Sequence, residues 1–299
     1  MPELPEVETM VRGVRPHAVG RTVVAVRRPR GGRNAAGEPL RPIALTPSLS
    51  SLAARVRGKK IEAVERRAKR VVLRLAGGRA IAIEPRMTGL LALGAPPTTD
   101  HVRLELHLAP APDAGRGDDA TAEYPVLRFW DRRGLGTVRL YEPGELETHL
   151  GPDKLGPDPL GLSPEQWAAS LAAAMKRTAR PVKVALLDQR VAAGVGNLYA
   201  SEALFHARLP PDRPGNELSE EEVDRLAVAV REVLTEAIRY EGSTLSDGTY
   251  LNALGDPGRY RNEHRVYQRH GAPCPRCGTG IVRTVQAQRS TFHCPTCQR

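Results

Sequence analysis

The cysteines constrain this 299-residue chain more than any other feature. All four lie near its end as two Cys-X-X-Cys pairs, Cys274 with Cys277 and Cys294 with Cys297, and 16 residues separate the pairs. This spacing is typical of a four-cysteine zinc site. Disulfides are the alternative in an oxidising compartment, but such pairs in an intracellular chain are more often metal ligands. Four thiolates fill a tetrahedral zinc ion, so we expect one structural zinc rather than a catalytic one.

The charge balance favours a polyanionic partner. Lysine and arginine number 44 against 34 acidic residues, giving a formal net charge of +10. Nucleic acid is the first candidate and an anionic membrane surface the second, while a merely soluble basic protein is the plain alternative. No apolar run approaches the 18 residues of a membrane-spanning helix. The first residues lack the pattern of a signal peptide, so we expect an intracellular protein.

The first half of the chain reads as an α+β region dominated by strands. A short amphipathic helix is expected from Val7 to Val14, ending at Gly20. Short β-branched or alternating runs then predict a β-sandwich or barrel over roughly residues 1 to 145. The predicted strands are Thr22 to Arg27, Lys60 to Glu65, Val71 to Leu75, Ala80 to Ile83, Val102 to Leu108 and Val126 to Trp130. Residues 29–47 and 109–123 are rich in Gly, Pro, Ala and Asp and are predicted surface loops.

The second half is helical in character. Ser163 and Ser219 each begin a capping box, because Gln166 and Glu222 follow three residues later. An apolar stripe from Val223 onward predicts a long helix. Residues 188–205 form a glycine-containing turn between helical patterns. Such a turn can present backbone N–H groups to a phosphate, although it is more often a structural connector.

The segment between the cysteine pairs predicts a basic β-hairpin whose tip could reach a phosphate. A solvated hairpin without such a role is the alternative. The polar residues that support the prediction are Arg283, Gln288, Arg289, Ser290 and Thr291.

Four motifs resemble one protein family. They are MPELPEVET at the start, ERRAKR at 65–70, DQRVAAGVGNLYASEALF at 188–205 and CPRCGTGIVRTVQAQRSTFHCPTCQR at the end. Together they resemble bacterial formamidopyrimidine-DNA glycosylase and its relative endonuclease VIII. The resemblance implies a multidomain α+β protein with an N-terminal β-sandwich over 1–148, a helix-two-turn-helix domain over 149–262 and a zinc finger over 263–299.

The resemblance implies a catalytic role for the N-terminus. Proline after Met1 permits removal of the initiator, which would leave Pro2 with a secondary amine. An α-amino group titrates near pH 7.7–8.0, so a useful fraction is neutral and nucleophilic. In the family pattern Glu3 transfers protons at the sugar, Glu6 keeps the site in order and Lys69 assists elimination. Glu3 and Glu6 could instead be simple partners of a helix dipole. Lys69, like Arg289 in the segment between the cysteine pairs, could be an ordinary exposed cation.

The resemblance also implies a set of DNA contacts. Arg289 and Asn197 match residues that contact the phosphates, and Lys183 matches a third such residue less securely. A glycosylase must take its target base out of the stack, so something must fill the gap. Met87 matches the inserted methionine and Arg133 the arginine that faces the orphaned base. Leu135 stands where the family commonly has phenylalanine, and an aliphatic wedge can still part a base step.

Three departures from the family pattern bear on which base is accepted. Glu84-Pro85-Arg86 replaces the more usual His-Leu-Gly before the methionine, and Gly134 replaces a second arginine. The region 246–261, where the family's base-capping loop lies, diverges.

These features predict an enzyme with two activities. We expect a DNA glycosylase and abasic-site lyase that excises oxidised purines, 8-oxoguanine and formamidopyrimidines, from double-stranded DNA and cleaves the strand by β,δ-elimination. The resemblance implies a monomer in the bacterial cytoplasm, associated with the nucleoid. An endonuclease VIII-like enzyme for oxidised pyrimidines is one alternative. A non-enzymatic zinc-ribbon DNA-binding protein is another, which would need the cysteines but not Pro2, Glu3 or Lys69.

Overall fold

The computed structural model describes residues 2–29, 40–110, 125–245 and 248–299. The chain forms two compact units, Met1–His149 with Glu241–Gly258, and Leu150–Tyr240 with Arg259–Arg299. The segment Glu241–Gly258 was expected in the helical domain, but it packs with the N-terminal unit. The zinc-finger region groups with the helical region, and the three predicted boundaries remain predictions.

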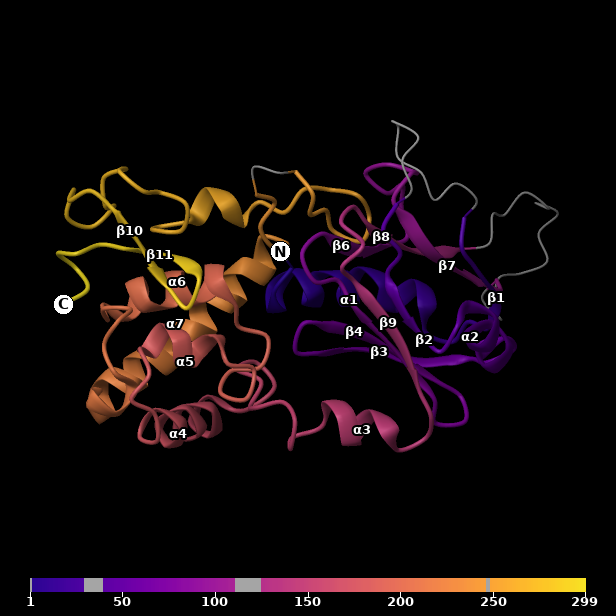
Figure 1. Ribbon diagram of the computed structural model, residues 1–299, viewed down its shortest axis with the longest axis horizontal. Helices are drawn as coiled ribbons and strands as arrows, with labels where there is room; N and C mark the ends of the chain where they lie inside the picture. The colour runs from indigo at the N-terminus through magenta and orange to yellow at the C-terminus, as the bar shows by residue number, and fades with distance from the viewer. Residues whose placement is uncertain (1, 30–39, 111–124, 246–247) are drawn as a thin grey trace. The chain divides into compact units, whose positions relative to one another are not determined.

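The N-terminal unit contains two sheets (Figure 1). One sheet has the strand order β1-β7-β8-β6 and is antiparallel. The other has the order β2-β9-β5-β4-β3 and is antiparallel except for the parallel pair β2 and β9. The strands are β1 (Val23–Arg27), β2 (Ala44–Thr46), β3 (Ile61–Arg67), β4 (Arg70–Leu75), β5 (Ala80–Glu84), β6 (Gly89–Ala92), β7 (Val102–Leu108), β8 (Val126–Asp131) and β9 (Thr137–Tyr141).

Helix α1 (Leu4–Ala18) runs between the two sheets and contacts strands of both (Figure 1). Its apolar face, Val7, Met10, Val11 and Val14, is fully buried in the core of the unit. Burial of this face places the residues just before the helix, Pro2 and Glu3, at the edge of the packed sheets. The expected helix is therefore confirmed.

Every predicted strand is present within two residues at each end, but five elements among the described residues of the N-terminal unit were not predicted. They are β2, β6, β9, and the short helices α2 (Leu49–Val56) and α3 (Glu145–Leu150). Strand β2 corrects the prediction that 29–47 is entirely loop. It has only three residues and pairs with the distant β9, so a local pattern could not reveal it. Residues 30–39 of the first predicted loop and 111–123 of the second lie outside the described residues.

The second unit is built of helices and one hairpin. The helices are α4 (Pro164–Met175), α5 (Val182–Leu187), α6 (Asn197–Ala207) and α7 (Glu220–Arg239), with 3₁₀ turns η1 (Gly215–Glu217) and η2 (Tyr260–Glu263). Both predicted capping boxes, at Ser163 and Ser219, are formed. The apolar stripe of α7 is buried as predicted.

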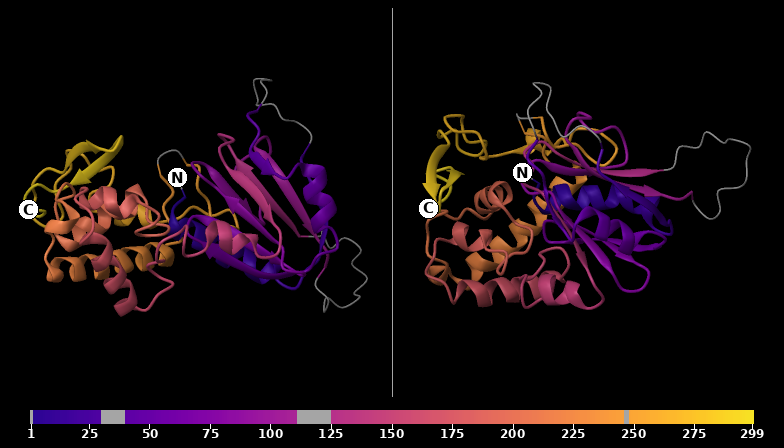
Figure 2. Two further views of the ribbon diagram at one scale, coloured as in Figure 1. Left: turned by 60° about the horizontal axis from the view of Figure 1, so that its bottom comes forward. Right: turned by 45° about the vertical axis from the view of Figure 1, so that its right-hand side comes forward.

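The predicted hairpin is also present, as β10 (Val282–Gln286) and β11 (Arg289–His293), and lies beside α6 (Figure 2). Its two turn residues, Ala287 and Gln288, have φ angles of 44° and 62°. Positive φ at both positions is the geometry that a tight two-residue hairpin turn requires.

Among the described residues, none of the helices has the length and apolar content needed to cross a membrane.

Candidate active site

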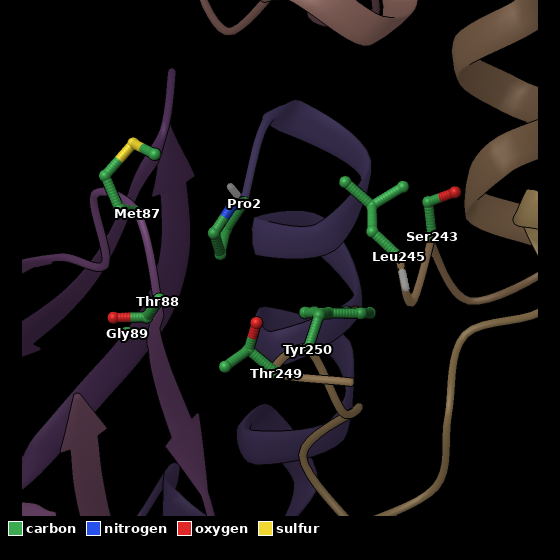
Figure 3. A pocket seen from close by; sticks show the side chains of 8 residues that line it. All are labelled: Pro2, Met87, Thr88, Gly89, Ser243, Leu245, Thr249 and Tyr250. Carbon is green, nitrogen blue, oxygen red and sulfur yellow. The ribbon is translucent and has the colours of Figure 1, made fainter. Parts of the chain in front are cut away.

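Pro2 lines a small pocket of the N-terminal unit (Figure 3). It lies at the start of α1, between the turn that carries Met87 and the segment that carries Ser243 and Leu245. The other lining residues are Thr88, Gly89, Thr249 and Tyr250. The pocket therefore brings together two residues that the sequence assigned to one site, Pro2 and Met87.

Glu3 and Glu6 are both buried beside Pro2, with 3% and 2% of their surface exposed. The Glu6 carboxylate accepts hydrogen bonds from the backbone N–H of Glu3 at 2.8 Å and of Ser243 at 2.9 Å. Glu6 thus links the start of α1 to the segment Glu241–Gly258. The expected role of Glu6 in keeping the site in order remains a prediction.

The approach of that segment to α1 requires a glycine at position 242. Gly242 has φ of +81°, and a Cβ there would lie 3.0 Å from Cγ of Glu6. A side chain would be strained in this backbone conformation and would push on the buried carboxylate.

Tyr250 is a site residue that the sequence analysis did not identify. It is 5% exposed, and its hydroxyl donates to the carbonyl oxygens of Glu241 at 3.1 Å and Glu6 at 3.4 Å. Burial and the nearby Glu6 carboxylate raise the pKa of Tyr250 well above its ordinary value. Tyr250 therefore stays protonated and continues to donate. Its segment diverges from the family pattern, so no sequence signal indicated it.

The turn that carries Met87 is tied to the loop that carries Arg133. The Thr88 hydroxyl donates to Oδ1 of Asp131 at 2.5 Å, and the backbone N–H of Arg133 donates to the Thr88 hydroxyl oxygen at 3.1 Å. The second Asp131 oxygen accepts from the backbone N–H of Gly136 at 2.7 Å. Asp131 is fully buried, whereas Met87 is 37% exposed. No motif indicated Asp131 as a site residue, although Asp131 opens the segment DRRGLG that carries Arg133.

Position 134 of the same loop has a backbone conformation that suits glycine. Gly134 has φ of +61°, and a Cβ there would clash with the carbonyl oxygen of Arg41. The described backbone therefore has no room for a side chain at this position. Arg133 and Leu135 both lie on this loop, where Arg133 is exposed and Leu135 is partly buried. Their contacts with DNA remain predictions.

Lys69 lies at the turn between β3 and β4, half-buried. It belongs to the same unit as Pro2. Its assistance to elimination remains a prediction.

In the second unit, Lys183 and Asn197 hold the hairpin. The Lys183 amine donates to Oδ1 of Asn197 and to the hydroxyl of Thr291, both at 2.7 Å, and to the carbonyl of Ser290 at 3.2 Å. The Asn197 amide also donates to the Ser290 carbonyl, at 2.9 Å. Lys183 is 0% exposed. The described geometry makes Lys183 an internal anchor, and its predicted phosphate contact stays a prediction.

Arg289 begins strand β11 and is exposed. Arg283, on the paired strand, donates to the Ser290 hydroxyl at 2.8 and 3.0 Å. The Ser290 hydroxyl is thus bound by Arg283, and its carbonyl oxygen is bound by Lys183 and Asn197. Arg289 is therefore next to a residue whose side chain and backbone are both fixed.

The four cysteine sulfurs lie within 4.8 Å of one another. Sγ of Cys274 is 3.9 Å from that of Cys297, and Sγ of Cys277 is 3.5 Å from that of Cys294. A tetrahedral zinc with Zn–S bonds of about 2.3 Å requires sulfur separations of about 3.8 Å. The described sulfurs therefore fit a zinc ion.

Glu202 connects the finger to the helical region and was also missed from the sequence. This fully buried carboxylate on α6 accepts three backbone N–H bonds, from Arg265 at 2.9 Å, Val266 at 3.1 Å and Tyr267 at 2.7 Å. Burial raises the pKa of Glu202, and the three N–H donors oppose that shift. The glutamate lies within the motif at 188–205, but only the fold reveals what it holds.

Comparison with known proteins defines the class. The formamidopyrimidine-DNA glycosylase N-terminal domain matches residues 1–138, the formamidopyrimidine-DNA glycosylase H2TH domain residues 155–249, and a zinc finger found in FPG and IleRS residues 271–299. These domains, in this order, are those of a DNA glycosylase with a zinc finger.

Full-length relatives agree. The chain is 40% identical over 303 residues to formamidopyrimidine-DNA glycosylase of Chloroflexus aurantiacus, covering 100% of this chain and 98% of the relative. It is 41% identical over 306 residues to the Thermus thermophilus enzyme, with the same coverage. The crystal structure of the MutM (Fpg) protein from Thermus thermophilus superposes with a TM-score of 0.79 at 40% identity, covering 99% of this chain and 98% of that one. The chain belongs to the formamidopyrimidine-DNA glycosylase family and is an enzyme of that family.

A Lactococcus lactis structure extends the comparison to a DNA complex. A mutant of the Lactococcus lactis FPG protein, solved with DNA containing Fapy-dG, matches with a TM-score of 0.82 at 28% identity and covers both chains fully.

Proposed function

We propose that the protein is a bifunctional DNA glycosylase and abasic-site lyase. It removes oxidised purines, 8-oxoguanine and formamidopyrimidines, from double-stranded DNA and then cleaves the strand by β,δ-elimination. The observation that carries this proposal is the position of Pro2 in a pocket that also contains Met87.

The chemistry begins once Met1 has been removed. The Pro2 amine attacks C1′ of the damaged nucleotide, and the bond to the base breaks as the base leaves with a proton. The C1′–O4′ bond of the sugar ring then breaks as O4′ takes up a proton, which leaves an iminium between Pro2 and the opened sugar. The iminium acidifies the proton on C2′, so loss of that proton expels the 3′ phosphate, and a second elimination expels the 5′ phosphate.

In this proposal the carboxylates of Glu3 and Glu6 have different roles. Glu3 is adjacent to the nucleophile, so it is carried to the sugar together with Pro2 and moves protons there. Glu6 is committed to two backbone N–H groups, at 2.8 and 2.9 Å, and therefore positions the site. Lys69 supplies a further proton carrier during elimination.

Extrusion of the base requires groups that replace it. In this proposal Met87 enters the gap, and Arg133 contacts the orphaned base with Leu135 beside it. The hydrogen bonds that Asp131 accepts support the proposal, because they hold the Met87 turn and the Arg133 loop together.

The second unit would bind the DNA backbone through Asn197 and Arg289, with Lys183 anchoring the hairpin. One zinc ion, held by the four cysteines, would be structural. The supporting features are the fit of the sulfur positions, the net charge of +10 and the DNA complexes of similar proteins. We further propose that the enzyme acts as a monomer in the bacterial cytoplasm.

One observation favours a second substrate class. A Lactococcus lactis Fpg complex that contains an oxidised pyrimidine matches the chain with a TM-score of 0.82 at 27% identity. The departures at Glu84 to Arg86 and at Gly134 also bear on base choice.

Single-turnover excision from duplexes tests the lesion class. Each duplex would carry one lesion: 8-oxoguanine, a formamidopyrimidine, or an oxidised pyrimidine. We expect faster release of the two purine lesions. Faster release of the pyrimidine would make the enzyme endonuclease VIII-like, and no release from any duplex would refute the glycosylase assignment.

A further inference from the structure

Arg86 has a strained backbone directly before Met87, one of the residues that line the Pro2 pocket. Its φ is +57°, in the left-handed region that favours glycine. It lies in the turn between β5 and β6 and directly precedes Met87, which lines the pocket (Figure 3). A residue with a Cβ is disfavoured in this conformation, and such residues cluster at binding and catalytic sites. The strain therefore raises the question of what the arginine side chain contributes.

The ion pair that Arg86 makes does not account for the strain. Its Nε lies 3.0 Å from Oε1 of Glu84, but the other oxygen of Glu84 is already 2.8 Å from the guanidinium of Arg70. The side chain of Arg86 is 54% exposed, against 23% for Arg70 and 14% for Glu84. An exposed ion pair stabilises a fold only slightly. The Glu84 carboxylate would keep a partner without Arg86.

The cluster formed by Arg70, Glu84 and Arg86 has one positive charge in excess. Arg70 and Arg86 carry two positive charges and Glu84 one negative charge, and the most exposed of the three is Arg86. Glu84 holds the Arg86 guanidinium at the surface, and Arg86 directly precedes Met87, the residue proposed to enter the DNA. A guanidinium presented in this way matches the geometry and charge of a phosphate group.

We propose that Arg86 binds a backbone phosphate of the DNA strand that carries the extruded nucleotide. Glu84 positions the guanidinium before DNA arrives, and the phosphate takes up the excess charge. The proposal rests on the proposed function, because it places DNA over the Pro2 pocket. It assigns a role to one of the departures from the family pattern, where glycine is more usual at this position.

The Arg86→Gly variant separates a binding role from a structural one. Glycine relieves the backbone strain, so we expect a melting temperature within about 2 °C of the wild type or higher. The dissociation constant for a duplex with a non-cleavable abasic-site analogue should rise by about 3- to 10-fold at moderate salt. The slope of its logarithm against the logarithm of salt concentration should fall by about one. Arg86→Lys, which retains the charge, should keep most of the slope.

Arg55→Ala is the matched control. Arg55 is 48% exposed and lies 3.0 Å from Glu142, so it resembles Arg86 in exposure and in ion pairing. This variant should bind the duplex as the wild type does. An Arg86→Gly variant that kept the wild-type dissociation constant and salt slope would overturn the proposal. A fall in melting temperature above about 5 °C in both Arg86 variants would also overturn it, because Arg86 would then support the fold.

These measurements do not depend on turnover. If the wild type binds the duplex but forms no covalent intermediate, the proposed chemistry fails while the Arg86 result still stands. If covalent trapping succeeds and Arg86→Gly binds normally, only the Arg86 proposal fails.

Discussion

The hydroxyl of Thr88 donates a 2.5 Å hydrogen bond to the buried carboxylate of Asp131. The same carboxylate accepts from the backbone N–H groups of Arg133 at 3.2 Å and Gly136 at 2.7 Å. One side chain therefore fixes both the turn that carries Met87 and the loop that carries Arg133. The Asp131 carboxylate thus holds the two segments whose side chains, Met87 and Arg133, are proposed to contact the DNA.

Asp131→Asn should loosen both segments. An amide has one acceptor oxygen, so its NH₂ group would face a backbone donor and leave that donor unpaired. We expect a loss of about 1–3 kcal/mol in the free energy of unfolding. Base excision should fall more than binding to undamaged duplex. Urea unfolding and single-turnover excision measure the two effects. The control is Glu142→Gln, which replaces a carboxylate at the surface of the same unit and should leave the rate of base excision unchanged. Equal excision rates for the two variants would contradict the proposal that Asp131 holds the Met87 turn and the Arg133 loop.

Met87→Ala and Arg133→Ala should impair base excision far more than cleavage at a preformed abasic site, where no base has to be extruded. Rates on the two substrates, measured under single turnover, test this expectation. Val24→Ala removes another exposed apolar side chain of the same unit, on strand β1, and is expected to change neither rate. Equal losses on both substrates would assign Met87 and Arg133 to general binding or folding.

Removal of the metal should unfold the finger. The finger has a small buried core, so we expect its folding to depend on zinc. Elemental analysis of protein purified without added metal should give about one zinc per chain. Cys294→Ser should lose the zinc and weaken duplex binding. Less than about half a zinc per wild-type chain would count against the assignment.

Acid should destabilise the second unit through His264. This residue is 5% exposed, and burial lowers its pKa from 6.5 to about 4. Protonation therefore favours the unfolded chain, so the stability held above pH 6.5 is lost as the pH falls from 6.5 toward 4. At pH 5 the loss amounts to about 2 kcal/mol.

His264→Phe tests this effect, because a phenyl ring keeps aromatic contact with Tyr260 and Tyr267. Urea unfolding at pH 7 and pH 5 should give a smaller pH dependence for the variant than for the wild type. The difference between the two proteins isolates His264 from other titrating groups. Parallel pH profiles would show that His264 does not titrate between the folded and unfolded states.

Sequence patterns within a few residues predicted the strands with alternating polarity and the helices that begin with a capping box. The alternating run Val102 to Leu108 is strand β7, and the capping boxes at Ser163 and Ser219 begin α4 and α7. Strand β2 was missed because its three residues pair with a strand more than 90 positions away. The cysteine spacing correctly placed four sulfurs together.

The candidate site was predictable only where a motif carried it. Pro2 and Met87 came from motifs, and the structure places both at one pocket. Asp131, Glu202 and Tyr250 act through hydrogen bonds to backbone outside their own elements, so nothing local distinguishes them from other polar residues. The burial of Lys183 likewise depends on the hairpin that packs over it.

The role of Pro2 as the nucleophile is tested most directly by trapping its covalent intermediate with borohydride. Reduction of the iminium should link the enzyme irreversibly to DNA that contains an oxidised purine, and peptide mapping should place the adduct at Pro2. A variant with one residue added before Pro2 should lose the adduct while it retains zinc and duplex binding. An adduct mapped to a lysine, or full activity with a verified blocked N-terminus, would contradict the account.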